Sequence, residues 1–151
     1  MNIQFEVLKK SRSLVLKFIE GLTMKQLSEI PKGFNNNIAW NVAHLVVTQQ
    51  LLHYKLSGLQ CLVSDELIEG YRKGTKPEHP FTEDEFEEVK ELLIALPDTL
   101  KEDYDVGIFK EFTQYETNSG FILSSFEHAI AFNNLHEGTH LGTIKAMRKL
   151  V

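Results

Sequence analysis

The 151-residue chain has little cysteine, no cluster of basic residues and no long apolar run. Its one cysteine, Cys61, has no partner for a disulfide within the chain. The net charge is −5, so we expect no nucleic-acid partner, because phosphate binding needs concentrated lysine and arginine. The longest apolar runs are about five residues, such as LLIAL, whereas a membrane-spanning helix needs about 20.

The opening segment, MNIQFEVLKKSRSLVLKF, carries charges throughout and no apolar block with a cleavage site, so we expect no signal peptide. These absences together predict a cytoplasmic protein that does not enter a membrane. Hydrophobic residues make up 42% of the chain and charged residues 25%, which is ordinary for a globular protein. The length predicts one domain over 1–151 with a full hydrophobic core.

The hydrophobic periodicity is helical along nearly the whole chain and predicts four long helices. The first, in 2–22, places five apolar residues near one face, which we expect to be the buried face: Ile3, Val7, Leu14, Phe18 and Leu22. The second, in 37–58, follows a capping asparagine and ends at a glycine. It is apolar nearly all round, which predicts burial on two sides, against a helix or a second subunit.

The third predicted helix begins with a capping box, Thr82 and Glu85, and Pro97 should kink or interrupt it. The last helix, in 121–150, ends in basic residues, as the helix dipole favours. A short helix is expected at 65–71, and a little extended structure at 105–120. Four long helices joined by one or two long crossings predict an all-α four-helix bundle.

The stretch NNLHEGTHLG places His136 and His140 one turn apart, on the face of the last helix that should point into the bundle. Burying unpartnered polar groups costs roughly 2–7 kcal/mol, and a metal ion would satisfy both imidazoles. The letters also spell the H-E-x-x-H of zinc proteases. However, Thr143 and Ala146 stand where the extended protease pattern has Gly and His, and no acidic residue or histidine follows His140. A further ligand must therefore lie upstream.

The best upstream candidate is His44, in the middle of the most apolar helix. Three imidazoles from two facing helices leave coordination positions open for water or substrate, which is typical of a reactive metal site. Neutral imidazoles favour Zn, Ni, Fe or Cu over Mg or Ca. The alternative is that the three histidines are hydrogen-bonded core residues that bind no metal.

Two segments resemble the DinB-like (YfiT-like) family. The first is NNIAWNVAHLVVTQQLLHYKLSG, in which a histidine follows a tryptophan by four residues, as in the family's second helix. The second is HAIAFNNLHEGTHLGTIKAMRKL, which is similar to the family's last helix with its H-x-x-x-H-x-G-x-I ending. The opening helix and the LSEIPKG loop also stand where that family has them.

This resemblance implies an up-down-down-up four-helix bundle with long connecting loops, often a homodimer. It implies a divalent transition metal, Zn or Ni, bound by His44, His136 and His140. Members of the family include thiol-dependent S-transferases and a maleylpyruvate isomerase that uses a low-molecular-weight thiol, which implies a small-molecule substrate and a thiol. The residues by themselves equally permit a metal-dependent hydrolase or a non-catalytic bundle that binds a metal or ligand.

Residues around the predicted ligands have several possible roles. Glu137 is open as general base, as a residue that orients a ligand, or as a surface residue, and we favour the last two. The polar residues one turn from the ligands are candidates for hydrogen bonds to them: Asn41, Thr48 and Asn133. We expect His128 in the core or at its boundary, His53 to be structural or exposed, and His79 to be solvated. Gly138, Gly142 and Ala146 predict close helix packing, within the subunit or across a dimer.

Overall fold

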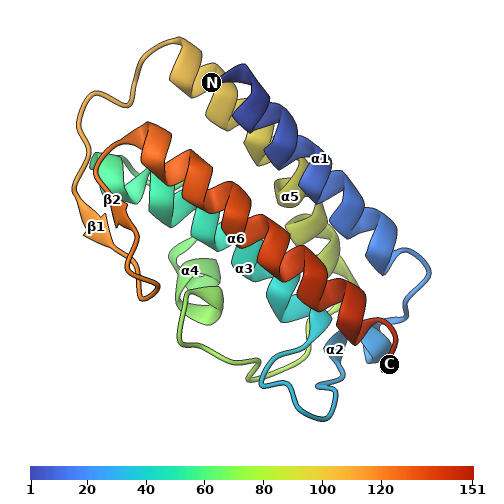
Figure 1. Ribbon diagram of the computed structural model, residues 1–151. Helices are drawn as coiled ribbons and strands as arrows, with labels where there is room; N and C mark the ends of the chain where they lie inside the picture. Colours follow the sequence, from blue (N-terminus) through green and yellow to red (C-terminus); the bar gives the residue numbers. More distant parts are fainter.

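A computed structural model describes residues 1–151 and contains four long helices. They are α1 (Asn2–Ile19), α3 (Ile38–His53), α5 (Glu83–Asp105) and α6 (Phe126–Met147). Helices α1 and α6 run in one direction and α3 and α5 in the other, which confirms the predicted all-α, up-down-down-up bundle (Figure 1). Helices α1 and α3 each pack against both α5 and α6, so α3 and α6 are antiparallel neighbours.

Shorter elements lie in the connections. Helix α2 (Met24–Ser28) precedes α3, and the 3-10 helix η1 (Lys55–Ser57) follows it. Helix α4 (Asp65–Tyr71) lies in the crossing between α3 and α5, and the antiparallel strands β1 (Tyr115–Glu116) and β2 (Ile122–Leu123) precede α6. The predicted short helix is therefore confirmed. Strand β1 falls in the stretch predicted to be extended, whereas β2 occupies residues that were predicted to begin the last helix, which starts only at Phe126. None of the helices combines the length and the apolar character that crossing a membrane requires.

The ends of the helices are fixed by capping side chains and by a glycine in the left-handed conformation. The side chain of Asn37 accepts the backbone N–H of Trp40 at 2.7 Å and caps α3. Thr82 and Glu85 form the predicted capping box at the start of α5. Gly58, with φ of +70°, takes the left-handed conformation that terminates the turn after α3. These caps fix where α3 begins and ends, and α3 carries the first predicted ligand.

The buried face of α1 differs from the predicted one. Ile3, Val7 and Leu14 are 62%, 41% and 43% exposed. The face that packs into the bundle carries a charged residue among apolar ones: Phe5, Leu8, Arg12, Val15 and Ile19. Apolar residues form two stripes along this helix. The second stripe is hard to recognise in the sequence because it contains an arginine. The prediction was wrong because a fully buried arginine is uncommon.

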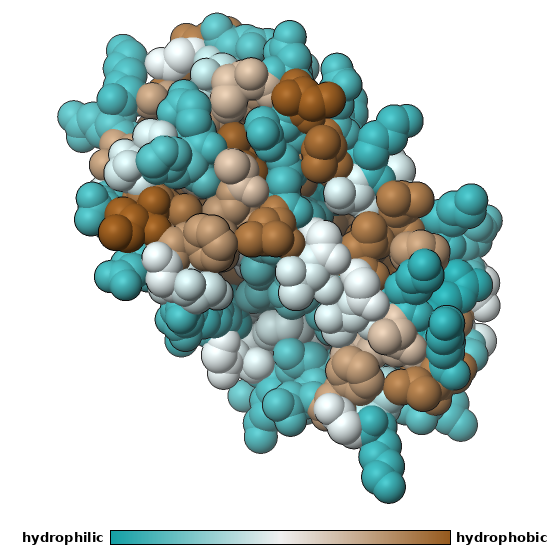
Figure 2. All heavy atoms as spheres, in the orientation of Figure 1, coloured by the Kyte–Doolittle hydropathy of each residue, from teal (hydrophilic) through white to brown (hydrophobic).

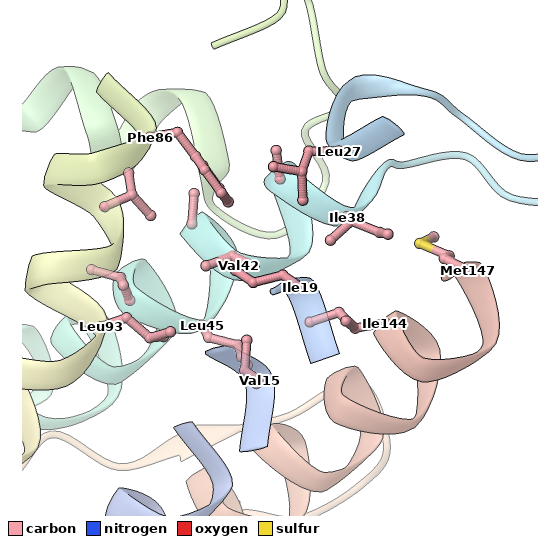
Figure 3. Packing of buried hydrophobic residues seen from close by; sticks show 14 of the residues in the cluster. Val15, Ile19, Leu27, Ile38, Val42, Leu45, Phe86, Leu93, Ile144 and Met147 are labelled. Carbon is pink, nitrogen blue, oxygen red and sulfur yellow. The ribbon is translucent and has the colours of Figure 1, made fainter. Parts of the chain in front are cut away.

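The core consists of two apolar clusters separated by a polar layer. The larger cluster joins α1, α3, α5 and α6 at the end of the bundle where α2 lies (Figure 3). The smaller, rich in aromatic residues, lies near the other end and includes Phe5, Tyr54 and Phe126. Between them Arg12 and Glu137 form a fully buried ion pair, with 2.9 Å between Nη2 and Oε1.

Arg12 also explains why Pro97 does not interrupt α5. Of the two predicted effects of this proline, a kink or an interruption, the interruption does not occur, because the helix is continuous from Glu83 to Asp105. Proline has no N–H, so the carbonyl four residues earlier, that of Leu93, loses its usual helical partner. Arg12 Nη1 donates to that carbonyl at 3.1 Å, and Nη2 donates to the carbonyl of Leu45 at 3.1 Å. One buried side chain of α1 thus contacts α3, α5 and α6.

Candidate metal centre

Three histidines from two helices meet on one side of the polar layer. His44 lies in the middle of α3, and His136 and His140 lie one turn apart on α6. One side-chain nitrogen of each lies within 4.8 Å of those of the other two. Nε2 of His44 and Nε2 of His136 are 3.2 Å apart. The antiparallel packing of α3 against α6 therefore brings all three predicted ligands together.

Hydrogen bonds at Nδ1 set the protonation of two of these rings. Nδ1–H of His44 donates to the carbonyl of Tyr71, at 2.6 Å. Nδ1–H of His140 donates to Oδ1 of Asn41, at 2.7 Å. Because both acceptors are oxygens that carry no proton, each ring keeps a lone pair on Nε2, the nitrogen that faces the centre.

Burial keeps the three imidazoles neutral. It lowers the pKa of His136 to about 2, and His140, His44 and Arg12 add to the effect. Burial and the nearby His44 lower the pKa of His140 to about 4. Burial also lowers the pKa of His44, although the hydrogen bond to Tyr71 acts in the opposite direction. Neutral imidazole is the form that binds a metal, so this donor set suits a divalent transition metal.

Two more side chains of α3 touch the centre. The ring of Trp40 stacks on that of His44, with 4.5 Å between centroids and 13° between planes. Trp40 Nε1 donates to Oγ1 of Thr75 at 3.1 Å, which fixes the indole. Oγ1 of Thr48 lies 3.3 Å from Nε2 of His44, beside the nitrogens that face the centre. The hydroxyl of Thr48 is thus placed to contact a molecule bound there.

A pocket of about 610 Å³ opens onto the histidines, a size that suits a small molecule. One wall is the α3 side, from His44 to Leu56, and the other is the α6 side, from Phe132 to His140. The turn of the β1–β2 hairpin, residues 117–119, lines the pocket between them. The three imidazoles are therefore accessible to a ligand, although each is largely buried.

Glu137 has none of the roles first considered for it. It is fully buried and bound to Arg12 through one carboxylate oxygen, so it is not a surface residue. It is absent from the pocket lining and makes no hydrogen bond to a histidine, so it is not placed as a base or as a partner of a ligand. Burial raises its pKa, and the Arg12 guanidinium opposes that rise. The protease reading of H-E-x-x-H therefore has no support in the geometry.

Of the three polar residues that were candidates for hydrogen bonds to the ligands, two contact a site histidine and one does not. Asn41 and Thr48 contact site histidines, whereas the buried side chain of Asn133 makes no hydrogen bond to any of the three. His53 is fully buried and donates Nδ1–H to the carbonyl of Gln49 at 2.8 Å, in keeping with a structural role.

One expectation outside the centre was wrong, and one of two alternatives is excluded. His128 is exposed, with Nδ1 3.1 Å from the hydroxyl of Ser124, and does not lie in the core. Gly138 and Gly142 face open space, which excludes close packing within the subunit and leaves packing across a dimer as the alternative. His79 is exposed, as predicted. Cys61 is half-buried, and burial raises the pKa of its thiol, which argues against a nucleophile.

Sequence reasoning missed the carbonyl of Tyr71, which is a backbone group with no signature of its own. It also missed Lys55 and Lys73, which line the pocket from η1 and from the loop after α4. Spacing on one helix cannot reveal them, because η1 and the loop after α4 reach the pocket only through the tertiary fold.

The geometry agrees with the comparison to known families. No curated protein sequence matches the chain closely enough to name a relative. The family description of the DinB superfamily matches residues 8–144, a stretch that includes all of α3 and α5, most of α1 and α6, and all three histidines. The chain therefore belongs to the DinB superfamily.

Proposed function

We propose that this protein is a metal-dependent enzyme that activates a small thiol for attack on a small electrophile. The observation that carries the proposal is the convergence of the nitrogens of His44, His136 and His140 at an open pocket. Three neutral nitrogen donors favour Zn or Ni. A divalent metal held there supplies a Lewis acid that lowers the pKa of a bound thiol or water toward neutrality.

The residues of the chain itself have separate tasks in this proposal. The Tyr71 carbonyl and Asn41 hold two of the ligand rings in the orientation that leaves Nε2 free. Burial keeps the rings unprotonated at neutral pH. The hydroxyl of Thr48 is a hydrogen-bond donor or acceptor beside the reacting group. No carboxylate lines the pocket, so no side chain there reduces the positive charge of the metal.

A metal-dependent hydrolase is the second candidate, since the same centre would lower the pKa of a water molecule. Its support is that the pocket contains no cysteine or carboxylate that would act as the nucleophile in place of water, and that it would admit water as readily as a thiol. Thiol transfer is preferred because the chain resembles thiol-dependent transferases of the superfamily. In that reaction the sulfur forms a bond to the electrophilic carbon, the leaving group departs with the bonding pair, and the thiol proton goes to solvent.

The first test is metal content. We expect about one transition metal per chain in purified protein, measured by mass spectrometry of the elements, and loss of that metal in His44→Ala and His140→Ala. His128→Ala is the matched control, since His128 lies on the same helix but is exposed. Protein that binds no metal, with stability unchanged in both ligand variants, would leave a non-catalytic bundle.

The second test is turnover. Zinc- or nickel-loaded protein is mixed with 2-mercaptoethanol and 1-chloro-2,4-dinitrobenzene, and thioether formation is followed by absorbance. We expect a rate above that of the metal-free protein and of His140→Ala. Cleavage of 4-nitrophenyl acetate without any thiol, in the absence of thiol-dependent turnover, would favour the hydrolase.

We further propose that the protein is a homodimer that uses the outer face of α1 and α6. Ile3, Val7 and Leu14 of α1 are exposed, and so is Leu135 of α6, 53% of which is accessible. On the face in Figure 2, apolar residues lie over both helices among hydrophilic ones. A second copy would cover an apolar surface that is otherwise left in water.

A further inference from the structure

The pocket at the histidines is positively charged on a protein that is negative overall. Aspartate and glutamate number 21 in the chain, against 16 lysines and arginines, yet none of the 14 pocket residues is acidic. Two of the 14 are lysines, Lys55 and Lys73. Neither lysine belongs to any of the five ion pairs of the structure. Their charges are therefore free to act on a molecule in the pocket.

The two lysines occupy different places along the pocket. Lys73 comes two residues after Tyr71, whose carbonyl binds His44, and it also borders the adjoining hollow beside Trp40. Lys55 lies in η1, eleven residues after His44. At 1.5 Å per residue this is about 16 Å along the helix axis, and a lysine side chain can reach back over part of that distance.

The wall between the histidines and Lys55 is apolar. Leu51, Leu52 and Leu56 come from the α3 side and Phe132 from α6. The hairpin turn adds the polar residues Asn118 and Ser119 to the lining. The pocket thus has a reactive end of neutral nitrogens, an apolar middle and a cationic far end. Such a pocket is complementary to a molecule with a reacting group at one end, an apolar segment in the middle and a negative charge at the other end.

We propose that one of the two reactants is an amphipathic organic anion, with its reacting group at the histidines and a carboxylate several carbons away at Lys55. Lys73 adds positive potential beside the histidines. This inference rests on the proposed function, because it takes the histidines as the reactive end. The carboxylate belongs to the thiol or to the electrophile, and both give the same recognition chemistry: an ammonium group that binds a carboxylate beyond an apolar segment.

The test compares two thiols that differ only in charge, 6-mercaptohexanoate and 6-mercaptohexanol. Binding to the zinc-loaded protein is measured by calorimetry, and binding to cobalt-loaded protein by the visible spectrum of Co²⁺, which reports on its ligands. We expect the acid to bind about two- to fivefold more tightly than the alcohol, as ion pairs near a surface allow. The preference should shrink as salt is raised, because the lysines are exposed.

Variants assign the preference to the lysines. Lys55→Met with Lys73→Met should bind the two thiols equally, and Lys55→Met alone should remove the larger share of the preference. Lys55→Arg should retain it, since the charge is kept. Lys10→Met, which removes an exposed lysine of α1 outside the pocket, is the matched control and should leave the preference unchanged.

A second arm moves the carboxylate to the electrophile. It compares the rates of 6-bromohexanoate and 6-bromohexanamide with 6-mercaptohexanol as the thiol, each relative to the uncatalysed reaction. A preference for 6-bromohexanoate, lost in the double variant, with no preference between the two thiols, would place the anion on the electrophile. Either assignment supports the proposal.

The two proposals fail separately. If neither thiol alters the Co²⁺ spectrum, thiol activation is wrong, while calorimetry still decides whether the pocket prefers the acid. If the acid and the alcohol bind equally and neither electrophile is favoured, the anion proposal is overturned and thiol activation stands. An acid preference that persists in the double lysine variant also overturns it.

Discussion

Nδ1 of His140 and Oδ1 of Asn41 lie 2.7 Å apart, which joins α6 to α3 at the three histidines. An amide oxygen only accepts, so the proton is on Nδ1 of His140 and the lone pair on Nε2. The amide is itself held, because Nδ2 of Asn41 donates to the carbonyl of Asn37 at 2.7 Å. Since Asn37 caps α3, the start of that helix positions a ring on another helix.

Asn41→Leu should weaken metal binding while the fold is kept. The substitution removes the acceptor that orients His140, and loss of such a partner typically costs about 10- to 100-fold in metal affinity. Competition with a chromophoric zinc chelator measures the affinity, and circular dichroism checks the helices. Asn41→Asp keeps an acceptor oxygen and should stay within a few-fold of wild type. An Asn41→Leu protein with wild-type affinity would contradict this role.

How far the sequence predicts the site depends on where each group lies. His136 and His140 are recognisable because their spacing is one helical turn, and His44 because an imidazole is unusual in so apolar a helix. The carbonyl of Tyr71 could not be predicted, since every residue has one and only the placement of α4 selects it. Lys55 is equally hidden, because lysines outside ion pairs are common on protein surfaces.

The fold was predictable wherever local signals act alone. The Asn37 cap and the box of Thr82 and Glu85 mark helix starts correctly. The face of α1 was not predictable, because burial of Arg12 is explained only by groups on three other helices. The same side chain compensates for Pro97. The proline leaves the carbonyl of Leu93 without its helical N–H partner, and Arg12, 81 positions away in the chain, donates to that carbonyl instead. Contacts between residues so far apart in the chain produce no pattern in the hydrophobic periodicity of the sequence.

Trp40 gives a direct optical test of the metal centre. It is the only tryptophan, and its ring stacks on that of His44 at 4.5 Å. Addition of Cu²⁺ or Ni²⁺ should quench its fluorescence, with saturation at about one equivalent if the metal binds at the three histidines. His136→Ala should abolish the saturable quenching, and His128→Ala should keep it. Tight metal uptake without quenching would locate the metal elsewhere.

Arg12→Met should be severely destabilising. It leaves the carboxylate of Glu137 buried without its partner, and breaking such a pair costs about 3–5 kcal/mol. The free energy of unfolding in urea measures the loss. Glu137→Gln should cost less, and it should keep metal binding and turnover, because Glu137 does not line the pocket. Loss of turnover in a folded, metal-bound Glu137→Gln protein would instead give the carboxylate a chemical role.

Pro97→Ala tests whether Arg12 also stabilises the protein by donating a hydrogen bond to the carbonyl of Leu93. Alanine restores the N–H that the carbonyl of Leu93 lacks, so that carbonyl no longer depends on the guanidinium. In the Pro97→Ala background, Arg12→Met should therefore cost about 1 kcal/mol less, which is the net value of one hydrogen bond. Equal costs in the two backgrounds would contradict the assignment.

His53 should make stability depend on pH. Burial, reinforced by Arg12 and opposed by the Gln49 carbonyl, lowers its pKa from 6.5 to about 4. Between these values the unfolded chain holds a proton that the folded chain does not, so the free energy of unfolding falls as pH falls from about 6.5 to about 4. His53→Leu should flatten that slope by up to about 1.4 kcal/mol per pH unit. His79→Leu, at an exposed position, should leave it unchanged.

Val7→Glu tests the proposed dimer. Val7 lies on the exposed apolar stripe of α1, and a second copy packed there would have to bury the new carboxylate without a partner. Wild-type protein should sediment as a dimer and the variant as a monomer with the same helix content. Val106→Glu introduces the same charge at a 75% exposed position after the end of α5 and should remain dimeric. A dimer that survives Val7→Glu would place the interface on another face, and a wild-type monomer would rule it out.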